Sequence, residues 1–401
     1  MPSLAQVRAQ FPTLADGFVY LENAGGSQVP ACVADAVRTY MTTSYVQLHA
    51  TYEVSKRSTA VVLGAHDFMN RYVNGEGLGI AILGPSSTQL CYMLAECYSR
   101  KLSPGDEVII CETAHEANAG PWARLERFGI VVRTWKINPD TYECDLDDLQ
   151  SMLNERTKLV AFPQVSNLLG DIVDVPAVTK MVHAAGARVV VDGVAYAPHR
   201  AIDVMAWDVD FYVYSTYKVF GPHMAVLFGK TEALSELEGP NHFFLPSNAY
   251  KFELGGANHE GCAGLLALGD YLNFLAETSG PVTRQTITCA WDVMESLELT
   301  LQAKMMDYLN SRPDLKIIGP TRRDASRVGI FSFQHPTLTP QEITARTDAA
   351  GIGIRSGNMY AYRMCLALGI DPAVGVTRIS LAHYNSEEEL DRLIEVLETT
   401  R

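Results

Sequence analysis

The sequence lacks the features of a nucleic-acid-binding, secreted or membrane protein. It has no run of five or more basic residues, and its net charge of −14 disfavours binding to nucleic acid. Its first residues, MPSLAQVRAQFPTL, contain no apolar segment typical of a signal peptide. No apolar stretch approaches the roughly 18 residues that a membrane span needs. We therefore expect a cytoplasmic protein with neither nucleic-acid nor membrane partners.

The sequence also lacks the patterns of metal sites, disulfide frameworks and nucleotide sites. Its eight cysteines are scattered and form no C-x-x-C pair, which favours reduced, buried thiols. Its ten histidines form no H-E-x-x-H motif and no cysteine–histidine cluster at zinc spacing, so we expect no metal. Neither G-x-G-x-x-G nor a Walker motif occurs, which disfavours a nucleotide-binding α/β protein.

What the sequence does contain is an alternation of apolar runs and helical patterns between Gly79 and Gly229. The runs predict seven strands, at residues 79–83, 107–111, 130–135, 158–162, 188–192, 211–215 and 224–229. Helices are expected in most of the gaps, at residues 86–102, 118–128 and 175–185. Such alternation predicts a mostly parallel sheet that is covered by helices.

After Gly255 the pattern changes to longer helices and shorter strands. A long helical region is expected at residues 259–310. Strands are expected near residues 317–319, 327–333, 351–357 and 376–382, with helices near residues 341–350, 360–368 and from Ser386 onward. Ser386 precedes three glutamates, which is a capping-box start. This content predicts a second, smaller α+β domain.

Two of the expected strands lead to residues that suit a reactive cofactor. Arg188–Val191 is followed by Asp192, and Phe211–Tyr214 leads to Lys218. Open α/β sheets bind ligands at the carboxyl ends of their strands. A lysine among apolar strands has a lowered pKa and can form a Schiff base, and a carboxylate can keep a pyridinium nitrogen protonated. The pair therefore fits pyridoxal phosphate (PLP); the alternative is a salt bridge at a strand end.

Other segments have both a structural and a functional interpretation. Ser86, Ser87 and Thr88 open a helix after a strand, where hydroxyls either cap the helix or bind a phosphate. His115 lies at a strand-to-helix junction, where a histidine is either structural or catalytic. Asn167 follows a strand, where asparagine is often a turn-former. These residues alone do not decide between the two interpretations.

Taken together, the segments resemble the class V aminotransferase family and, within it, the cysteine-desulfurase-like branch. The segments that carry the resemblance are AHEAN (114–118), VSNLLG (165–170), VDGVA (191–195) and STYKVFGP (215–222). The resemblance implies PLP fold type I, an α/β fold whose large domain has a mostly parallel seven-stranded sheet and whose C-terminal domain is smaller and α+β. Residues 15–258 and 259–401 would form these domains, and residues 1–14 would pack with the smaller one.

The same resemblance implies roles for residues around the PLP ring. Lys218 would form the Schiff base, and Asp192 would pair with the ring nitrogen. His115 would stack on the ring and move protons, and Asn167 would hydrogen-bond the phenolic oxygen. Ser215, three residues before the lysine, would bind the phosphate.

Further contacts to the phosphate are implied at two places. The turn with Ser86, Ser87 and Thr88 would hold the phosphate, although the resemblance does not say which of the three hydroxyls touch it. Residues 253–259 match a segment that reaches the phosphate of the neighbouring subunit, with His259 in place of the usual threonine. The protein is therefore expected to be a homodimer with active sites at the interface.

On the substrate side, Arg378 in VTRISLAHYN matches an arginine that binds the α-carboxylate, because a guanidinium offers a planar fork. Arg355 matches a second arginine near the substrate; for each arginine the alternative is a surface salt bridge. Asn23 and Gly25, after a short strand at residues 18–21, match a segment that lines the substrate side. They could also form an ordinary strand-to-helix turn that leads into a helix opened by Pro30.

Three departures from the desulfurase pattern bear on the reaction. Tyr360 stands where desulfurases have the cysteine that takes up sulfur, and Cys365 lies five residues later in a helical pattern. Tyr217 replaces the histidine before the lysine, and Ala195 replaces a glutamine. These changes predict an amino-acid substrate bulkier than cysteine, with Tyr360 beside it, and disfavour a persulfide-forming desulfurase.

The predicted function is PLP-dependent chemistry at Cα of an amino acid. The candidate reactions are elimination, racemisation, transamination and carbon–carbon bond formation, such as a cyclisation in small-molecule biosynthesis. The alternatives are a cysteine desulfurase or a cysteine or sulfoxide lyase, and an inactive partner protein with the PLP fold. Retention of Asp192, Lys218, Asn167, His115 and Arg378 disfavours the inactive protein.

Overall fold

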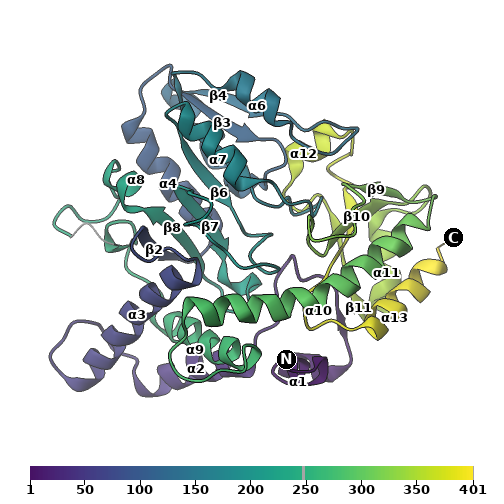
Figure 1. The fold of residues 1–401 in the computed structure, drawn as a ribbon, viewed down its shortest axis with the longest axis horizontal. Coiled ribbons are helices and arrows are strands. Elements are labelled where there is room, and N and C mark those ends of the chain that lie inside the picture. Colours follow the sequence, from purple (N-terminus) through teal and green to yellow (C-terminus); the bar gives the residue numbers. More distant parts are fainter. Residues whose placement is uncertain (246–248, 401) are drawn as a thin grey trace.

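A seven-stranded sheet forms the larger part of the structure, a computed structural model that describes residues 1–245 and 249–400 (Figure 1). In spatial order its strands are β2 (Gly79–Gly84), β8 (Ala225–Lys230), β7 (Phe211–Ser215), β6 (Arg188–Asp192), β5 (Thr157–Pro163), β3 (Glu107–Cys111) and β4 (Val131–Trp135). Neighbours run parallel except β8, which is antiparallel to both β2 and β7. The mostly parallel seven-stranded sheet is therefore confirmed.

Alternate residues of these strands face two different hydrophobic cores. On β6, Val189 and Val191 pack with residues of α3 (Glu53–Tyr72) and α7 (Val175–Ala184). Val190 faces the opposite core, which includes residues of α4 (Ser87–Lys101). Helices thus cover both faces of the sheet, and this double burial explains why the strands read as continuous apolar runs.

The continuous helix expected at residues 118–128 is wrong. The structure has a 3-10 turn at Glu116–Asn118, a single helical turn, α5 (Gly120–Ala123), and another 3-10 turn at Arg124–Phe128. Pro121 has no N–H for a helical hydrogen bond. The Asn118 side chain also bonds outside its own turn, because it accepts from Trp122 Nε1 at 3.1 Å and donates to the Phe162 carbonyl on β5 at 3.4 Å. Tertiary hydrogen bonds therefore break the helical pattern.

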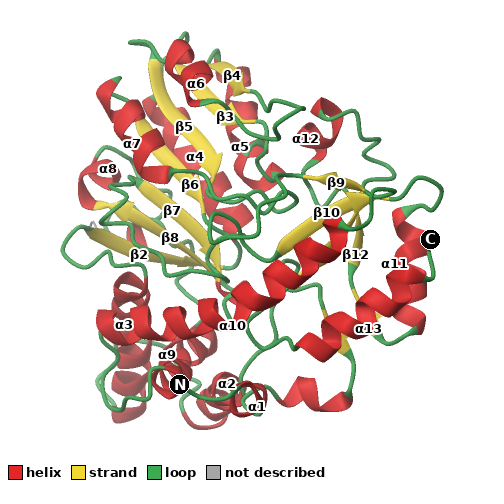
Figure 2. Cartoon of the chain, turned by 45° about the vertical axis from the view of Figure 1, so that its right-hand side comes forward, coloured by secondary structure: helices red, strands yellow, loops and turns green. Residues whose placement is uncertain are grey.

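The helical region expected at residues 259–310 is two helices. α9 (His259–Leu275) ends before Gly280-Pro281, and α10 (Arg284–Asn310) follows. α9 packs against α2 (Ala31–Thr43) and α3, and α10 runs from that helical group to the smaller sheet (Figure 2). α10 is thus a long connection between the two sheets.

The smaller sheet is antiparallel and lies beside the carboxyl ends of the large one (Figure 2). Its strands, in spatial order, are β12 (Arg355–Gly357), β13 (Val376–Ser380), β10 (Ile330–Gln334) and β9 (Lys316–Ile318). The associated helices are α11 (Pro340–Ala349), α12 (Tyr362–Ala367) and α13 (Glu387–Glu398). The smaller α+β part is confirmed. The short helices α1 (Leu4–Arg8), α6 (Leu146–Met152) and α8 (Thr231–Ser235) complete the structure.

The strand expected at residues 351–357 is divided between two sheets. β11 (Ile352–Gly353) pairs in parallel with β1 (Val19–Tyr20), whereas β12 belongs to the smaller sheet. Near the N-terminus, Arg8 donates to the Tyr384 carbonyl at 2.7 Å, and the Phe11 ring packs on both Tyr384 and Phe220. The N-terminal segment thus contacts both parts of the chain, and the domain limits at residues 15–258 and 259–401 stay a prediction. Within the described residues, no helix combines the length and apolarity of a membrane span.

Candidate active site

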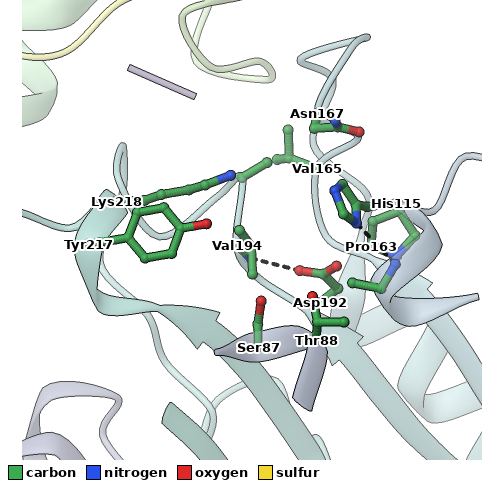
Figure 3. A pocket seen from close by; sticks show the side chains of 12 residues that line it. Ser87, Thr88, His115, Pro163, Val165, Asn167, Asp192, Val194, Tyr217 and Lys218 are labelled. Atoms are coloured by element: carbon green, nitrogen blue, oxygen red, sulfur yellow. Dashed lines mark hydrogen bonds between the residues drawn. The ribbon is translucent and has the colours of Figure 1, made fainter. Parts of the chain in front are cut away.

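A two-part cavity lies between the carboxyl ends of the central parallel strands and strands β12 and β13 of the smaller sheet. Its inner part is lined mainly by Ser87, Thr88, Pro163, Val165, Asp192, Val194 and Ala195 (Figure 3). Its outer part is lined mainly by Ala24, Gly25, Arg355, Asn358, Tyr360 and Arg378. Four residues line both parts: His115, Asn167, Tyr217 and Lys218. The structure thus brings most of the expected site residues together.

Asp192 is the last residue of β6 and is only 6% exposed. Its Oδ1 accepts a hydrogen bond from the Val194 N–H at 2.9 Å, and its carboxylate points into the inner cavity (Figure 3). Burial raises the pKa of Asp192 to about 6, although the Val194 N–H and the charge of Lys218 both act to lower it. Within the described residues, no cationic side chain forms an ion pair with this carboxylate, which would gain a partner from a protonated ring nitrogen.

Lys218 ends a 3-10 turn (Thr216–Lys218) that directly follows β7. Thr216 fixes this turn, because its hydroxyl donates to the carbonyls of Pro222 and Met224 at 2.6 and 2.9 Å. Burial of the ammonium group lowers the pKa of Lys218 to about 8, and the cation of Arg378 lowers it further while Asp192 opposes the shift. The lowered pKa makes the neutral form of Lys218 more accessible near neutral pH than that of an ordinary lysine, and neutral lysine is the nucleophilic form.

His115 is uncharged in this environment. Its Nδ1 accepts from the Ala117 N–H at 3.0 Å, which leaves the proton of the neutral ring on Nε2. Burial lowers the pKa of His115 to about 4, and the charges of Lys218 and Arg378 act in the same direction. Its ring centroid lies 5.2 Å from that of Tyr360. A neutral imidazole at this place can pack against a flat ligand without adding charge.

Asn167 and Arg378 form a buried polar pair with unused hydrogen-bonding atoms. Arg378, on β13, is 3% exposed and donates from Nη1 to the Asn167 carbonyl at 3.2 Å. The Asn167 side-chain N–H donates to the Met359 carbonyl at 2.8 Å. Within the described residues, Arg378 Nε and Asn167 Oδ1 have no partner, and burial lowers the pKa of Arg378 to about 10. Such groups are costly to bury and indicate a place for a polar ligand.

The three hydroxyls at the start of α4 have different roles. Ser86 is the N-cap: its Oγ accepts from the Gln89 N–H at 3.1 Å, and Ser86 does not line the cavity. Ser87 and Thr88 do line it, and Ser215 Oγ donates to Ser87 Oγ at 3.1 Å. The spacing from Ser86 to Gln89 is that of a capping box, so the role of Ser86 as the N-cap could have been predicted from the sequence. Ser87, Thr88 and Ser215 are therefore the hydroxyls available to a phosphate at the helix N-terminus.

Four expected site residues do not line the cavity formed by their own chain: Ser86 and Ser215, described above, and Asn23 and His259. The Asn23 side-chain N–H groups donate to the carbonyls of Tyr20 and Ser380 at 3.0 Å, so Asn23 ties β1 to β13 instead of facing a substrate. His259 is the first residue of α9 and lines neither part of the cavity formed by its own chain.

The rim of the outer cavity is formed by Arg355, Gly25 and Tyr360. Arg355 is exposed and pairs with Glu22, whose carboxylate raises the pKa of this guanidinium. Tyr360 is 67% exposed and has φ +61°, an uncommon left-handed conformation for a non-glycine residue that often marks functional sites. Glu22 was not predicted as a site residue, although it directly precedes Asn23 in the segment expected to line the substrate side.

The residues present fit PLP. Lys218 offers an amine of lowered pKa, Asp192 a buried carboxylate and Asn167 an unpartnered amide oxygen. The hydroxyls at the start of α4 and at Ser215 would hold the phosphate, and Lys218 would hold the cofactor covalently.

The comparisons with known proteins agree with this chemistry. The Aminotransferase class-V family matches residues 19–393. The aminotransferase-like protein FGM3 of Gibberella zeae is 37% identical to this chain, and the match covers 99% of this chain and 98% of FGM3. The nonribosomal peptide synthetase-like enzyme fsqF of Aspergillus fumigatus is 34% identical over 98% of this chain, which corresponds to 26% of fsqF.

Among solved structures, the cysteine desulfurase CsdA of Escherichia coli is similar to this chain with a TM-score of 0.83 and 27% identity. The alignment covers 100% of this chain and 98% of that one, so both the large sheet and the smaller part are included. The chain therefore belongs to the class V aminotransferase family and is a PLP-dependent enzyme of fold type I.

Proposed function

We propose that this enzyme acts at Cα of an amino acid, by elimination or by carbon–carbon bond formation, and does not form a persulfide. The observation that carries the proposal is the buried guanidinium of Arg378, which lines the same cavity as Lys218 and whose Nε has no hydrogen-bond partner in the described part of the chain. A guanidinium binds a carboxylate through two parallel hydrogen bonds. The amine of Lys218 and the guanidinium of Arg378 together suit a substrate that carries both an amine and a carboxylate.

The chain's own residues supply binding and proton transfer. Bound PLP supplies the electron sink that a carbanion at Cα requires. Lys218, whose pKa is lowered to about 8, is the base that moves the Cα proton, because neutral and protonated forms are both accessible near neutral pH. The buried carboxylate of Asp192 would stabilise a protonated ring nitrogen. His115, held neutral, would pack against the cofactor ring without adding charge.

The cysteines do not support sulfur transfer. Within the described residues, no cysteine lines either part of the cavity. Cys365 is fully buried in α12, and burial raises the pKa of its thiol to about 11. A persulfide-forming cysteine must be accessible and readily ionised. Tyr360 occupies the rim of the cavity instead.

The relatives favour a role in small-molecule biosynthesis. The name of fsqF describes a nonribosomal peptide synthetase-like enzyme, and the present chain matches about a quarter of it. FGM3, named as aminotransferase-like, matches along its whole length. A cysteine desulfurase or lyase is the second candidate, because the similarity to CsdA extends over the entire chain. An inactive partner protein is disfavoured by the retained pair of Lys218 and Asp192.

The experiment that tests the proposal incubates the holoenzyme with a panel of amino acids in heavy water. Deuterium at Cα, or a product of elimination, ring closure or decarboxylation, is expected from at least one member. The Arg378→Met variant should weaken binding of that amino acid far more than binding of the corresponding amine without the carboxylate. Equal losses for both ligands would show that Arg378 does not bind the carboxylate. Rapid release of alanine and sulfide from cysteine would favour the second candidate.

We also propose that the enzyme is a homodimer, with His259 of each chain near the phosphate site of the other. Its support is the position of His259 outside the cavity of its own chain, on a segment that also exposes Leu254. Light scattering after gel filtration should give twice the chain mass of 44.0 kDa. A monomeric mass with full PLP occupancy would refute the shared site.

A further inference from the structure

The outer cavity contains two arginines that stand side by side. In the ladder between β12 and β13, Arg355 is directly opposite Arg378, so both side chains project from the same face of the sheet. Both also line the outer cavity. Like charges directly opposite each other are destabilising. The site therefore needs an acid to compensate one of them.

Glu22 provides that acid, and it pairs with only one of the two arginines. Its carboxylate forms an ion pair with Arg355 at the rim, where the side chains are 36% and 52% exposed. Arg378, by contrast, is buried and forms a hydrogen bond only to a backbone carbonyl within the described residues. Glu22 thus neutralises the outer guanidinium and leaves the inner one available to a ligand.

Gly25 makes room for this arrangement. A Cβ atom at position 25 would overlap Glu22 Oε1 and would lie 3.1 Å from Glu22 Cδ. Gly25 lines the outer cavity, and Glu22, which is not among the lining residues, contacts the cavity through its ion pair with Arg355. Any side chain at this position would push the carboxylate away from Arg355. The glycine and the glutamate therefore act together to set the charge at the rim.

We propose that Glu22 makes the site selective for amino acids with a single carboxylate, by neutralising Arg355 at the rim. This inference rests on the proposed function, since it takes Arg378 as the receptor of the α-carboxylate. A side-chain carboxylate of the substrate that reaches the rim meets an arginine whose charge Glu22 already neutralises, so it finds no free cation there. Glu22 is a positioning residue, because it acts through Arg355.

The size of the effect follows from the removal of one charge. Between charges several ångströms apart at a partly exposed site, a unit change in charge alters affinity by about tenfold. L-Glutamate and L-glutamine are the suitable probes, because they have nearly the same shape and differ by one negative charge. Binding of each to the holoenzyme is followed by the change in absorbance of the bound PLP. The measured quantity is the ratio of the two dissociation constants.

The native enzyme should prefer glutamine. The Glu22→Gln variant should shift the ratio toward glutamate by about tenfold, because Arg355 is freed and can pair with the second carboxylate. Gly25→Ala should shift it in the same direction without any change in charge. In the double variant Glu22→Gln/Arg355→Met, the gain for glutamate should disappear. The matched control is Glu76→Gln, which breaks an ion pair of similar exposure with Arg71 that does not line the cavity.

The outcomes separate this inference from the proposed function. An unchanged ratio in Glu22→Gln would overturn the selectivity assigned to Glu22. A gain for glutamate that persists in the double variant would overturn the route through Arg355. If neither probe changes the PLP absorbance of the native enzyme while other amino acids do, the single-carboxylate selectivity is refuted and the proposed function stands. If no amino acid does, the proposed function itself fails.

Discussion

Replacing Arg378 by methionine should stabilise the protein without PLP and at the same time remove carboxylate binding. Burial lowers the pKa of this guanidinium from 12.5 to about 10, which corresponds to a cost of about 3 kcal/mol in the folded state. The substitution also removes the hydrogen bond to the Asn167 carbonyl, a loss of about 1.5–3 kcal/mol. The net expectation is a gain in the free energy of unfolding on the order of 1 kcal/mol.

Binding should change in the opposite direction and by more. Without Arg378, the substrate carboxylate would enter the cavity unpaired, at a cost of about 3–5 kcal/mol. This cost corresponds to a loss of about 10²–10⁴-fold in affinity for the amino acid. Affinity for the amine that lacks the carboxylate should be nearly unchanged.

Urea unfolding of the PLP-free variants at pH 7 measures the first effect, and absorbance titration of the holoenzymes measures the second. The matched control is Arg355→Met, because Arg355 is exposed and its ion pair with Glu22 should contribute at most about 1 kcal/mol. If Arg378→Met lowers the free energy of unfolding by more than about 1 kcal/mol, the buried guanidinium is a structural partner, and the account of an unused charge is wrong.

Four further predictions follow from the site. Lys218→Ala should lose covalent retention of PLP after borohydride reduction; retention of the label in mass spectra would exclude Lys218 as the attachment point. Asp192→Asn should reduce the rate by about 10²-fold. Burial raises the pKa of Asp192 to about 6, so its ionised form destabilises the fold above that pH. In urea unfolding, the gain in stability of Asp192→Asn over the native protein should therefore be larger at pH 8 than at pH 4. Ser87→Ala should weaken PLP binding, whereas Ser86→Ala should cost about 1 kcal/mol of stability through the lost cap and leave PLP affinity unchanged in a fluorescence titration. Cys365→Ala should leave turnover unchanged; loss of turnover would reopen sulfur transfer.

The sequence determined the large sheet because local patterns carry that information. The central strands β3, β5, β6 and β7 are buried on both faces, so each appears as a short apolar run that needs no partner to be recognised. The positions of Asp192 and Lys218 followed from the ends of two such runs. The family resemblance then implied the cofactor, which the family match confirms.

Several features were decided only by contacts between distant segments. The pattern at residues 351–357 looks like one strand, yet its halves pair with strands that are far away in sequence. The helical pattern at residues 118–128 gives way to side-chain hydrogen bonds with Phe162 and Trp122. Local propensity is a weak preference that such tertiary bonds override.

Local sequence patterns also did not show which site residues face a ligand and which bond to other parts of the chain. Asn23 matches a substrate-side segment, but its amide is used to join β1 to β13. Arg355 and Arg378 are 23 residues apart in sequence and have the same chemistry. The register between β12 and β13 places them opposite each other. The position of Glu22 then decides which of the two is neutralised. The sequence alone determined which chemical groups are present. The tertiary structure decided which are paired and which remain free, because charge and burial depend on neighbours that are distant along the chain.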